Sequence, residues 1–234
     1  MSKLQFAVLA SGSKGNAVAV FPGDGPGFLL DCGLSQKVLQ KRLEIVGKNL
    51  EDIQGAFITH HHGDHFNGSG LSGMSWIRSI FTQVPANPAD DIDGCMIKGF
   101  KLSHGDLPCH GFRVDYKEMS FAYLVDTEYV PEESLKYLFD LDAIIIEANY
   151  RENMIKGRSN IHGDPTSRHL SNEQAACVLG LINSTRLKHV IMAHGSSRNN
   201  TPAFACNAGT WGAPQAQVLW SEQDRPTKMI TLMS

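Results

Sequence analysis

A short run of histidines carries the clearest chemical signal in this sequence. Four side chains that commonly bind metal ions lie within six residues: His60, His62, Asp64 and His65. Neutral imidazole is the commonest metal ligand in proteins, and mixed nitrogen and oxygen ligands suit zinc and its first-row neighbours. Once other segments contribute, four ligands from one loop exceed the needs of a single tetrahedral ion. The run therefore indicates a pair of ions, which suits displacement at phosphorus. The alternative is an exposed histidine-rich tract that binds metal adventitiously.

The elements around this run place it where a strand opens into a loop. Residues 55–58 are apolar and β-prone, and residues 66–70 have the composition of a loop. Ligands from one short loop converge easily on one point, whereas ligands on a helix need a spacing of four residues.

Further along the chain, four polar residues come directly after apolar runs: His104, Asp126, Glu147 and His194. A polar side chain at the end of a buried strand is costly unless it has a partner. A shared metal centre gives several of them one partner. For any single one of these residues, an ordinary hydrogen-bonded structural role is the alternative.

Hydrophobic patterning predicts a mixed fold in which sheet layers are sandwiched by helices. Helical patterns cover residues 35–46, 131–139 and 171–185, and the last begins with a capping box formed by Ser171 and Gln174. Residues 85–94 are predicted to be a loop, and little structure is assigned after Thr201. The predicted strands are 6–9, 17–21, 28–31, 55–59, 97–102, 111–115, 120–125, 143–147 and 189–193.

Composition narrows the class of protein further. The 234 residues are 42% hydrophobic and 19% charged, which suits one globular domain spanning residues 1–234. The net charge of −3 argues against a strongly basic nucleic-acid binder but leaves room for a local basic patch. The sequence has no apolar run long enough to span a membrane and no signal peptide, so no membrane partner is expected. An odd number of cysteines without CxxC spacing favours free thiols and a cytoplasmic location: Cys32, Cys95, Cys109, Cys177 and Cys206.

The pattern HxHxDH at residues 60–65 resembles the signature of the metallo-β-lactamase superfamily. The resemblance implies an α/β fold, a four-layer αβ/βα sandwich with the site on loops at one edge of its two sheets. It also implies two divalent metal ions, with Zn²⁺ favoured over Mn²⁺ as the bound metal. The first ion would be held by His60, His62 and His104, and the second by Asp64, His65 and His194, with Asp126 bridging both. Asp31 would brace the histidine loop without binding metal.

Other segments resemble one branch of that superfamily. Phosphodiesterases of the branch that includes tRNase Z have a glutamate and histidine pair. The segment 147–150, which begins with Glu147, and the segment 168–176, which contains His169, are similar to the two parts of this pair. Segments 11–16 and 193–200 complete a pattern typical of the YycJ-type subfamily, whose members are regarded as 5′-to-3′ DNA exonucleases. The resemblance therefore implies a nucleic-acid substrate, with DNA favoured over RNA.

The same resemblance assigns catalytic roles. Asp64 or Asp126 would take a proton from the attacking water, and His169, oriented by Glu147, would protonate the departing sugar oxygen. The glycine-rich residues 11–16 could offer backbone N–H groups to a phosphate, or form only a tight turn. Basic residues near the motifs could form a phosphate track: Lys14, Arg151, Lys156, Arg158, Arg168 and Arg198.

Two other classes of function remain open from the sequence. One is a small-molecule hydrolase on the same fold, such as a cyclic phosphodiesterase, a thioesterase or a lactonase. The His169 and Glu147 pair argues for phosphodiester over thioester cleavage but does not separate a polymer from a small phosphodiester. The other is a non-enzymatic protein that binds metal or a partner, which the full set of ligands disfavours.

Overall fold

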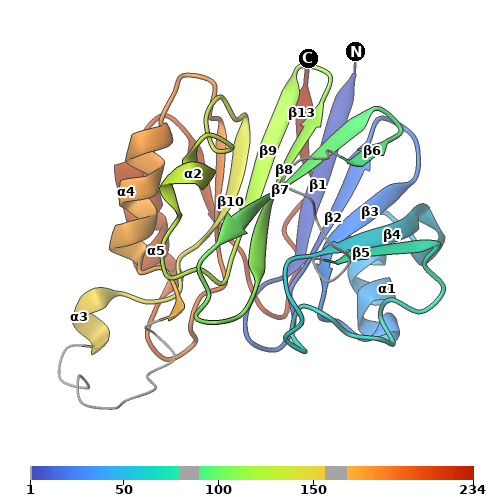
Figure 1. Cartoon of the computed structure of the whole chain (residues 1–234), viewed down its shortest axis with the longest axis horizontal. Helices are drawn as coiled ribbons and strands as arrows, with labels where there is room; N and C mark the ends of the chain where they lie inside the picture. The colour runs from blue at the N-terminus through green and yellow to red at the C-terminus, as the bar shows by residue number, and fades with distance from the viewer. Residues whose placement is uncertain (1, 80–89, 156–167) are drawn as a thin grey trace. The chain divides into compact units, whose positions relative to one another are not determined.

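The computed structural model of this chain describes residues 2–79, 90–155 and 168–234 (Figure 1). The chain forms two compact units. The first unit contains Met1–Gly99, Val114–Met119 and Ser221–Ser234, and the second contains Phe100–Arg113 and Ser120–Trp220. One domain across residues 1–234 stays a prediction. No helix in the described part of the chain is long and apolar enough to cross a membrane.

The first unit is built on a six-stranded mixed sheet. The order of its strands is β13 (Ile230–Met233), β1 (Lys3–Ala10), β2 (Ala17–Pro22), β3 (Gly27–Cys32), β4 (Ile53–Ile58) and β5 (Trp76–Ser79). Strands β3, β4 and β5 are parallel, whereas the other neighbours are antiparallel.

Helix α1 (Gln36–Ile45) covers this sheet's hydrophobic core. It buries Leu39 and Leu43 in a cluster that includes Leu29, Ala56 and Ile58 from the strands. The 3-10 helix η1 (Leu50–Asp52) leads from this helix into β4. The core therefore fixes β3 and β4, the two strands whose carboxyl ends carry Asp31 and the histidine run.

The second sheet has seven strands, in the order β12 (Gln217–Trp220), β11 (His189–Ala193), β10 (Ala143–Glu147), β9 (Met119–Leu124), β8 (Cys109–Tyr116), β7 (Cys95–Leu102) and β6 (Asp90–Ile92). Strands β9 to β12 are parallel. The near-continuous apolar sequences of β9, β10 and β11 are typical of strands buried on both faces.

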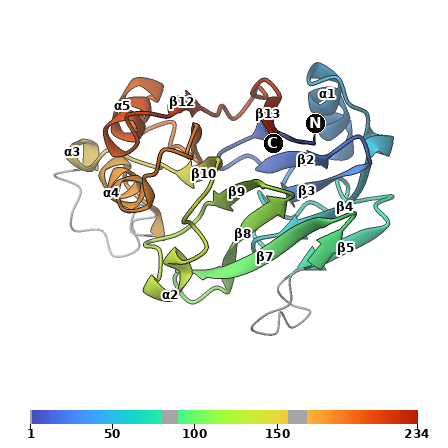
Figure 2. The ribbon, with the colours of Figure 1, turned by 90° about the horizontal axis from the view of Figure 1, so that it is seen from above.

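Two long helices belong to the second unit together with two short ones. Helices α4 (Asn172–Ile182) and α5 (Pro202–Gly212) pack on each other, α4 against β10 and α5 against β11 and β12, as Figure 2 shows from above. The short helices are α2 (Glu132–Leu135) and α3 (Glu152–Ile155). The apolar side chains of α4 enter a core with Ile144, Ile146 and Met192 of the strands.

The structure contains every strand and helix that the sequence predicts. Strands β10 and β11 have the predicted boundaries, and the boundaries of the other elements differ by a few residues. Helix α2 ends at Leu135, earlier than predicted, and α4 ends at Ile182. The capping box of α4 is present, because Ser171 accepts from the Gln174 amide and the Gln174 side chain accepts from the Ser171 amide.

Two predictions of irregular structure are wrong. Residues 90–92 of the expected loop form strand β6, which pairs with β7 across a turn at Asp93 and Gly94, and Asp-Gly is a strong hairpin signal. Residues 85–89 lie outside the described residues. After Thr201 the chain forms α5, β12 and β13, since Thr201 caps α5 and Pro202 occupies its first turn.

Candidate active site

The histidine run lies in the first unit, directly after β4. His60 is buried, His62 is exposed, and their Nε2 and Nδ1 atoms are 2.9 Å apart. Two nitrogen ligands of one tetrahedral zinc ion are about 3.3 Å apart, given zinc–nitrogen bonds of about 2.0–2.1 Å. The two rings therefore already converge on one point at nearly the spacing that a shared ion requires.

Asp31 holds this run from the neighbouring strand. Its fully buried carboxylate accepts hydrogen bonds from the Thr59 amide (2.8 Å) and the Thr59 hydroxyl (2.9 Å), and it lies 2.7 Å from Nδ1 of His65. An Nδ1–H group that donates to this carboxylate places the lone pair of the His65 ring on Nε2, the nitrogen that would bind a metal. This geometry is what a bracing aspartate requires.

Asn16 contacts the same loop, and the sequence patterns gave it no such role. Its side-chain amide lies 2.9 Å from Nε2 of His65, and its backbone N–H donates to the Asp64 carbonyl oxygen at 2.7 Å. His65 must exchange this amide for the ion if Nε2 binds metal. The backbone of Gly33 is so close to the loop that an added Cβ would lie 1.7 Å from the Asp64 oxygen. Glycine is therefore required at position 33 for the loop to close over β3.

The second set of predicted residues lies at the carboxyl ends of three parallel strands in the second unit. Leu124 of β9 pairs with Ile146 of β10, which pairs with Met192 of β11. Parallel strands in this register bring the residues just beyond them to one edge of the sheet. This edge carries Asp126, Glu147 and His194.

These strand ends form a tight cluster with His169. Nδ1 of His169 lies 2.7 Å from Oε1 of Glu147 and 3.0 Å from Oδ1 of Asp126. Nδ1 of His194 lies 2.9 Å and 3.1 Å from the same two oxygens. Ligand-type atoms of these four residues lie within 4.8 Å of one another, close enough to hold a metal ion.

Glu147 is the organising residue of this cluster. It is fully buried, and its Oε2 accepts hydrogen bonds from the backbone N–H groups of Thr127 (2.9 Å) and Leu170 (3.2 Å). Oε1 is thereby directed at the two histidines. Burial opposes its charged form, but His169 and His194 outweigh burial and lower the pKa of Glu147.

The two neighbouring histidines of the second unit have opposite pKa shifts. Burial disfavours a charged His169, but Glu147 and Asp126 outweigh it and raise the pKa of His169 to about 9. Burial is also the main cause at His104, where it lowers the pKa. Nδ1 of His104 lies 3.2 Å from the Arg168 carbonyl oxygen, so an Nδ1–H donor there leaves Nε2 as the metal-binding nitrogen.

The backbone is strained where several site residues sit. Asp31, Asp126 and His194 have φ angles of 59°, 55° and 52°, in the left-handed region that non-glycine residues rarely adopt. Each such residue costs about 1–3 kcal/mol and clusters of them mark functional sites. Asn149 supports the strained His194, because its side chain donates to the His194 carbonyl oxygen at 2.7 Å.

The structure thus places the predicted site residues in two groups. The first unit holds His60, His62, Asp64 and His65, and the second holds His104, Asp126, Glu147, His169 and His194. The supporting residues Asn16, Thr59, Thr127 and Asn149 were not identified from the sequence, although each is a short polar residue beside a strand end. Of the predicted phosphate track, Lys156 and Arg158 lie outside the described residues, and Arg168 is exposed.

Comparison with known proteins identifies the class. Residues 11–71 match the family model of the metallo-beta-lactamase superfamily, which covers Asp31 and the histidine run. The fold is similar to the metallo-beta-lactamase fold protein YhfI from Bacillus subtilis, with a TM-score of 0.72 and 13% identity over 97% of this chain and 99% of that one. It is also similar to the short form of human tRNase Z, with a TM-score of 0.64 and 21% identity over 95% and 98%. The chain therefore has the predicted αβ/βα metallo-β-lactamase fold, which is the fold of a metal-dependent hydrolase family, and it is an enzyme.

Particular relatives lie in the branch that the sequence predicts. The chain is 28% identical to exodeoxyribonuclease WalJ from Streptococcus pneumoniae, over 86% of this chain and 85% of the relative. It is 27% identical to exodeoxyribonuclease YycJ from Bacillus anthracis, over 86% of each. The resemblance to YycJ-type proteins is confirmed. The fold and the histidine and aspartate side chains suit a dinuclear metal site.

Proposed function

We propose that this protein is a dinuclear metal-dependent phosphodiesterase that digests DNA from the 5′ end towards the 3′ end. The observation that carries the proposal is the contact of His169 with Glu147 beside Asp126 and His194. Such an arrangement supplies a proton donor next to candidate metal ligands, which phosphodiester cleavage needs. The exodeoxyribonuclease relatives support DNA as the substrate.

The ligand assignment is part of this proposal. His60, His62 and His104 would hold one ion, Asp64, His65 and His194 would hold the other, and Asp126 would contribute to both. Imidazole and carboxylate ligands fit Zn²⁺ and also Mn²⁺. When bound, such ions would provide an activated water and offset charge that develops on the phosphate.

The protein's own residues then move protons and fix positions. Asp64, 23% exposed at its side chain, takes the proton of the attacking water and directs its approach. His169, 16% exposed at its side chain, is held through Nδ1 by the buried Glu147. Its other ring nitrogen, Nε2, donates a proton to the departing sugar oxygen.

The proposal also includes the location of the protein, its preferred nucleic acid and its domain organisation. The five cysteines are free thiols, which supports a cytoplasmic protein. DNA is favoured over RNA because the relatives are exodeoxyribonucleases. We also propose that residues 1–234 form a single catalytic domain.

The direct test is digestion of 5′- and 3′-end-labelled single- and double-stranded DNA and RNA by protein loaded with Zn²⁺ or Mn²⁺. We expect stepwise loss of DNA from the 5′ end, abolished by Asp64→Ala. His61→Ala is the matched control, because His61 lies in the same loop, is exposed and stacks on Phe66 rather than serving as a ligand. Hydrolysis of bis(p-nitrophenyl) phosphate with no digestion of any nucleic acid would contradict the proposal.

A further inference from the structure

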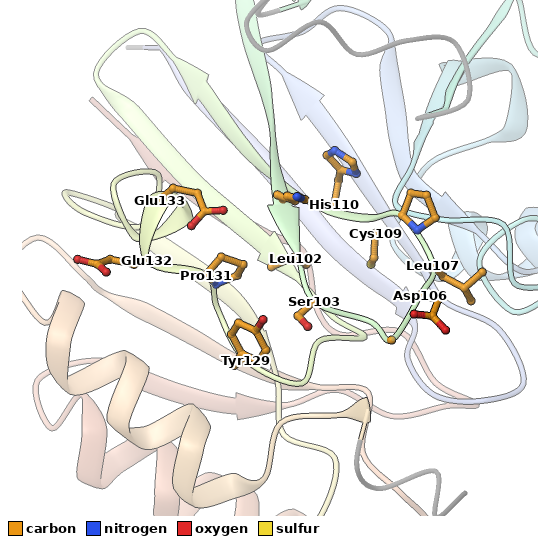
Figure 3. A pocket seen from close by; sticks show the side chains of 13 residues that line it. Leu102, Ser103, Asp106, Leu107, Cys109, His110, Tyr129, Pro131, Glu132 and Glu133 are labelled. Atoms are coloured by element: carbon orange, nitrogen blue, oxygen red, sulfur yellow. The ribbon is translucent and has the colours of Figure 1, made fainter.

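A cavity of about 530 Å³ lies in the second unit, and its lining includes Ser103 and Gly105, the neighbours of His104 in the chain (Figure 3). The end of β7 and the residue after it, through Lys101, Leu102 and Ser103, form one part of its lining. The second part runs from Gly105 through the start of β8 at Cys109 and His110, and the third is the segment from Tyr129 to Glu133 that follows β9. All of these residues belong to the second unit, and none is among the metal ligands proposed above.

Hydrogen bonds connect the walls of this cavity to the strand-end cluster. The Glu128 amide donates to the Ser103 carbonyl oxygen at 2.7 Å, and the Ser103 amide donates to the Thr127 hydroxyl at 3.1 Å. Thr127 also donates its amide to Oε2 of Glu147. The cavity is therefore held at a fixed position relative to Asp126 and Glu147, as a substrate subsite must be.

Several side chains of the cavity offer flat or apolar surfaces. Tyr129 is 56% exposed and Leu107 is 41% exposed, and Pro108 and Pro131 complete the apolar part of the lining. An exposed tyrosine at a cavity mouth is a stacking platform for a ligand with a π-face.

The charged side chains of the cavity argue against a phosphate inside it. Asp106, Glu132 and Glu133 contribute three carboxylates, whereas Lys101 is the one cation among the lining residues apart from His110. Burial and then Lys101 lower the pKa of His110, which favours the neutral form of this ring. Carboxylates repel phosphate but accept hydrogen bonds from the amino groups of bases.

A nucleobase has the two properties that suit this lining. Its flat faces can stack on the exposed ring of Tyr129, and its amino groups can donate hydrogen bonds to the carboxylates.

We propose that this cavity binds the nucleobase of the nucleotide next to the scissile phosphate, with the base stacked on Tyr129. The inference rests on the proposed nuclease function and extends it, because it assigns the base to one subsite. Stacking on an aromatic ring tolerates every base, so the subsite contributes affinity to an exonuclease without restricting its sequence.

The test compares DNA that has a normal 5′-terminal nucleotide with the same DNA carrying an abasic 5′-terminal nucleotide. For the wild-type enzyme, we expect KM to be roughly tenfold higher for the abasic end, because the stacking contact is lost. Tyr129→Ala should raise KM for the normal end and abolish this discrimination. Tyr129→Phe keeps the ring and should retain it. Phe139→Ala is the matched control, because Phe139 is a 45% exposed aromatic residue of the same unit that does not line the cavity.

The outcomes separate this inference from the function on which it rests. Digestion of DNA with equal KM for normal and abasic ends overturns the base subsite and leaves the nuclease standing. The base subsite is also overturned if a Tyr129→Ala protein, shown to be folded by its melting temperature, keeps the difference in KM between normal and abasic ends. Hydrolysis of bis(p-nitrophenyl) phosphate without any digestion of DNA overturns both proposals.

Discussion

The two groups of site residues differ in how the chain brings them together. In the first unit, His60, His62, Asp64 and His65 follow one another in a single loop. In the second unit, the cluster is spread from residue 126 to residue 194 and includes Glu147 and His169. The first group is a property of a short segment, whereas the second exists only because β9, β10 and β11 are parallel and in register.

The two groups nevertheless use the same structural device. Each has a buried carboxylate that lies against a histidine, Asp31 against His65 and Glu147 against His169, and both contacts are 2.7 Å. Each also includes residues with a left-handed backbone at a strand end. Both the compact loop and the sheet edge thus fix the orientation of an imidazole ring. This matters because an imidazole binds a metal or transfers a proton efficiently only when its tautomer and direction are fixed.

The largest expected effect comes from removing one ligand in each unit. His60→Ala and His194→Ala should each lower the metal content and abolish hydrolysis, whereas Asp126→Ala should lose both ions. Metal analysis by mass spectrometry together with hydrolysis of bis(p-nitrophenyl) phosphate measures this. A His194→Ala protein with full metal content would show that the strand-end cluster is not part of the metal centre.

His169→Ala should separate proton donation from metal binding. We expect turnover of DNA to fall by about 10²- to 10⁴-fold, the usual contribution of a general acid, with the metal content intact. Measured kcat and metal stoichiometry decide between the two roles. Loss of metal in this variant would make His169 a ligand and contradict its role as the acid.

Asp31→Asn tests the brace of the histidine loop. The substitution keeps the shape but removes the charge opposite Nδ1 of His65, so metal affinity should fall by about 10- to 100-fold. Competition with a chelating dye measures the affinity. Asp24→Asn is the control, since Asp24 is exposed and pairs with Lys3 at the surface.

Gly33→Ala should destabilise the loop by steric overlap. The added Cβ would overlap the Asp64 carbonyl oxygen, and overpacking of this kind costs about 1–3 kcal/mol or more. Gly63→Ala in the same loop meets no atom within 4 Å, so its free energy of unfolding should change little. Urea denaturation measures the free energy of unfolding of both variants. Equal values would show that the loop can shift to accommodate the added Cβ at little cost.

Cysteine labelling gives the smallest and most local readout. Burial raises the pKa of Cys32, whose amide bonds to the His65 carbonyl oxygen, to about 12, whereas Cys177 on α4 is exposed. Because the thiolate is the reactive form and Cys32 is fully buried, iodoacetamide at pH 8 should label Cys177 and leave Cys32 of the native protein unlabelled. Peptide mapping by mass spectrometry follows both sites. Equal labelling rates would indicate that the histidine loop opens in the native protein.

Helix α5 shows why part of the fold could not be predicted. Its sequence contains Gly209 and Gly212, which are poor helix formers. In the structure, an added Cβ at Gly209 would overlap Met192 and Val218, and one at Gly212 would overlap Ala176 and Leu179. Close packing against α4 and the sheet therefore stabilises this helix, and such packing is invisible in the local pattern. The Thr201 cap and Pro202 were the available signals.

The sequence by itself determined nine of the thirteen strands of the described chain, the three patterned helices and the identity of the histidine loop. These features rest on local periodicity and on ligands that are neighbours in the chain. It also assigned Glu147 and His169 to one pair, but only through resemblance to a family. The tertiary structure decided which strand ends meet, that Asn16 lies against His65, and that a cavity opens beside His104. These facts depend on strand register and loop packing between residues far apart in the chain, and a sequence pattern does not encode them locally.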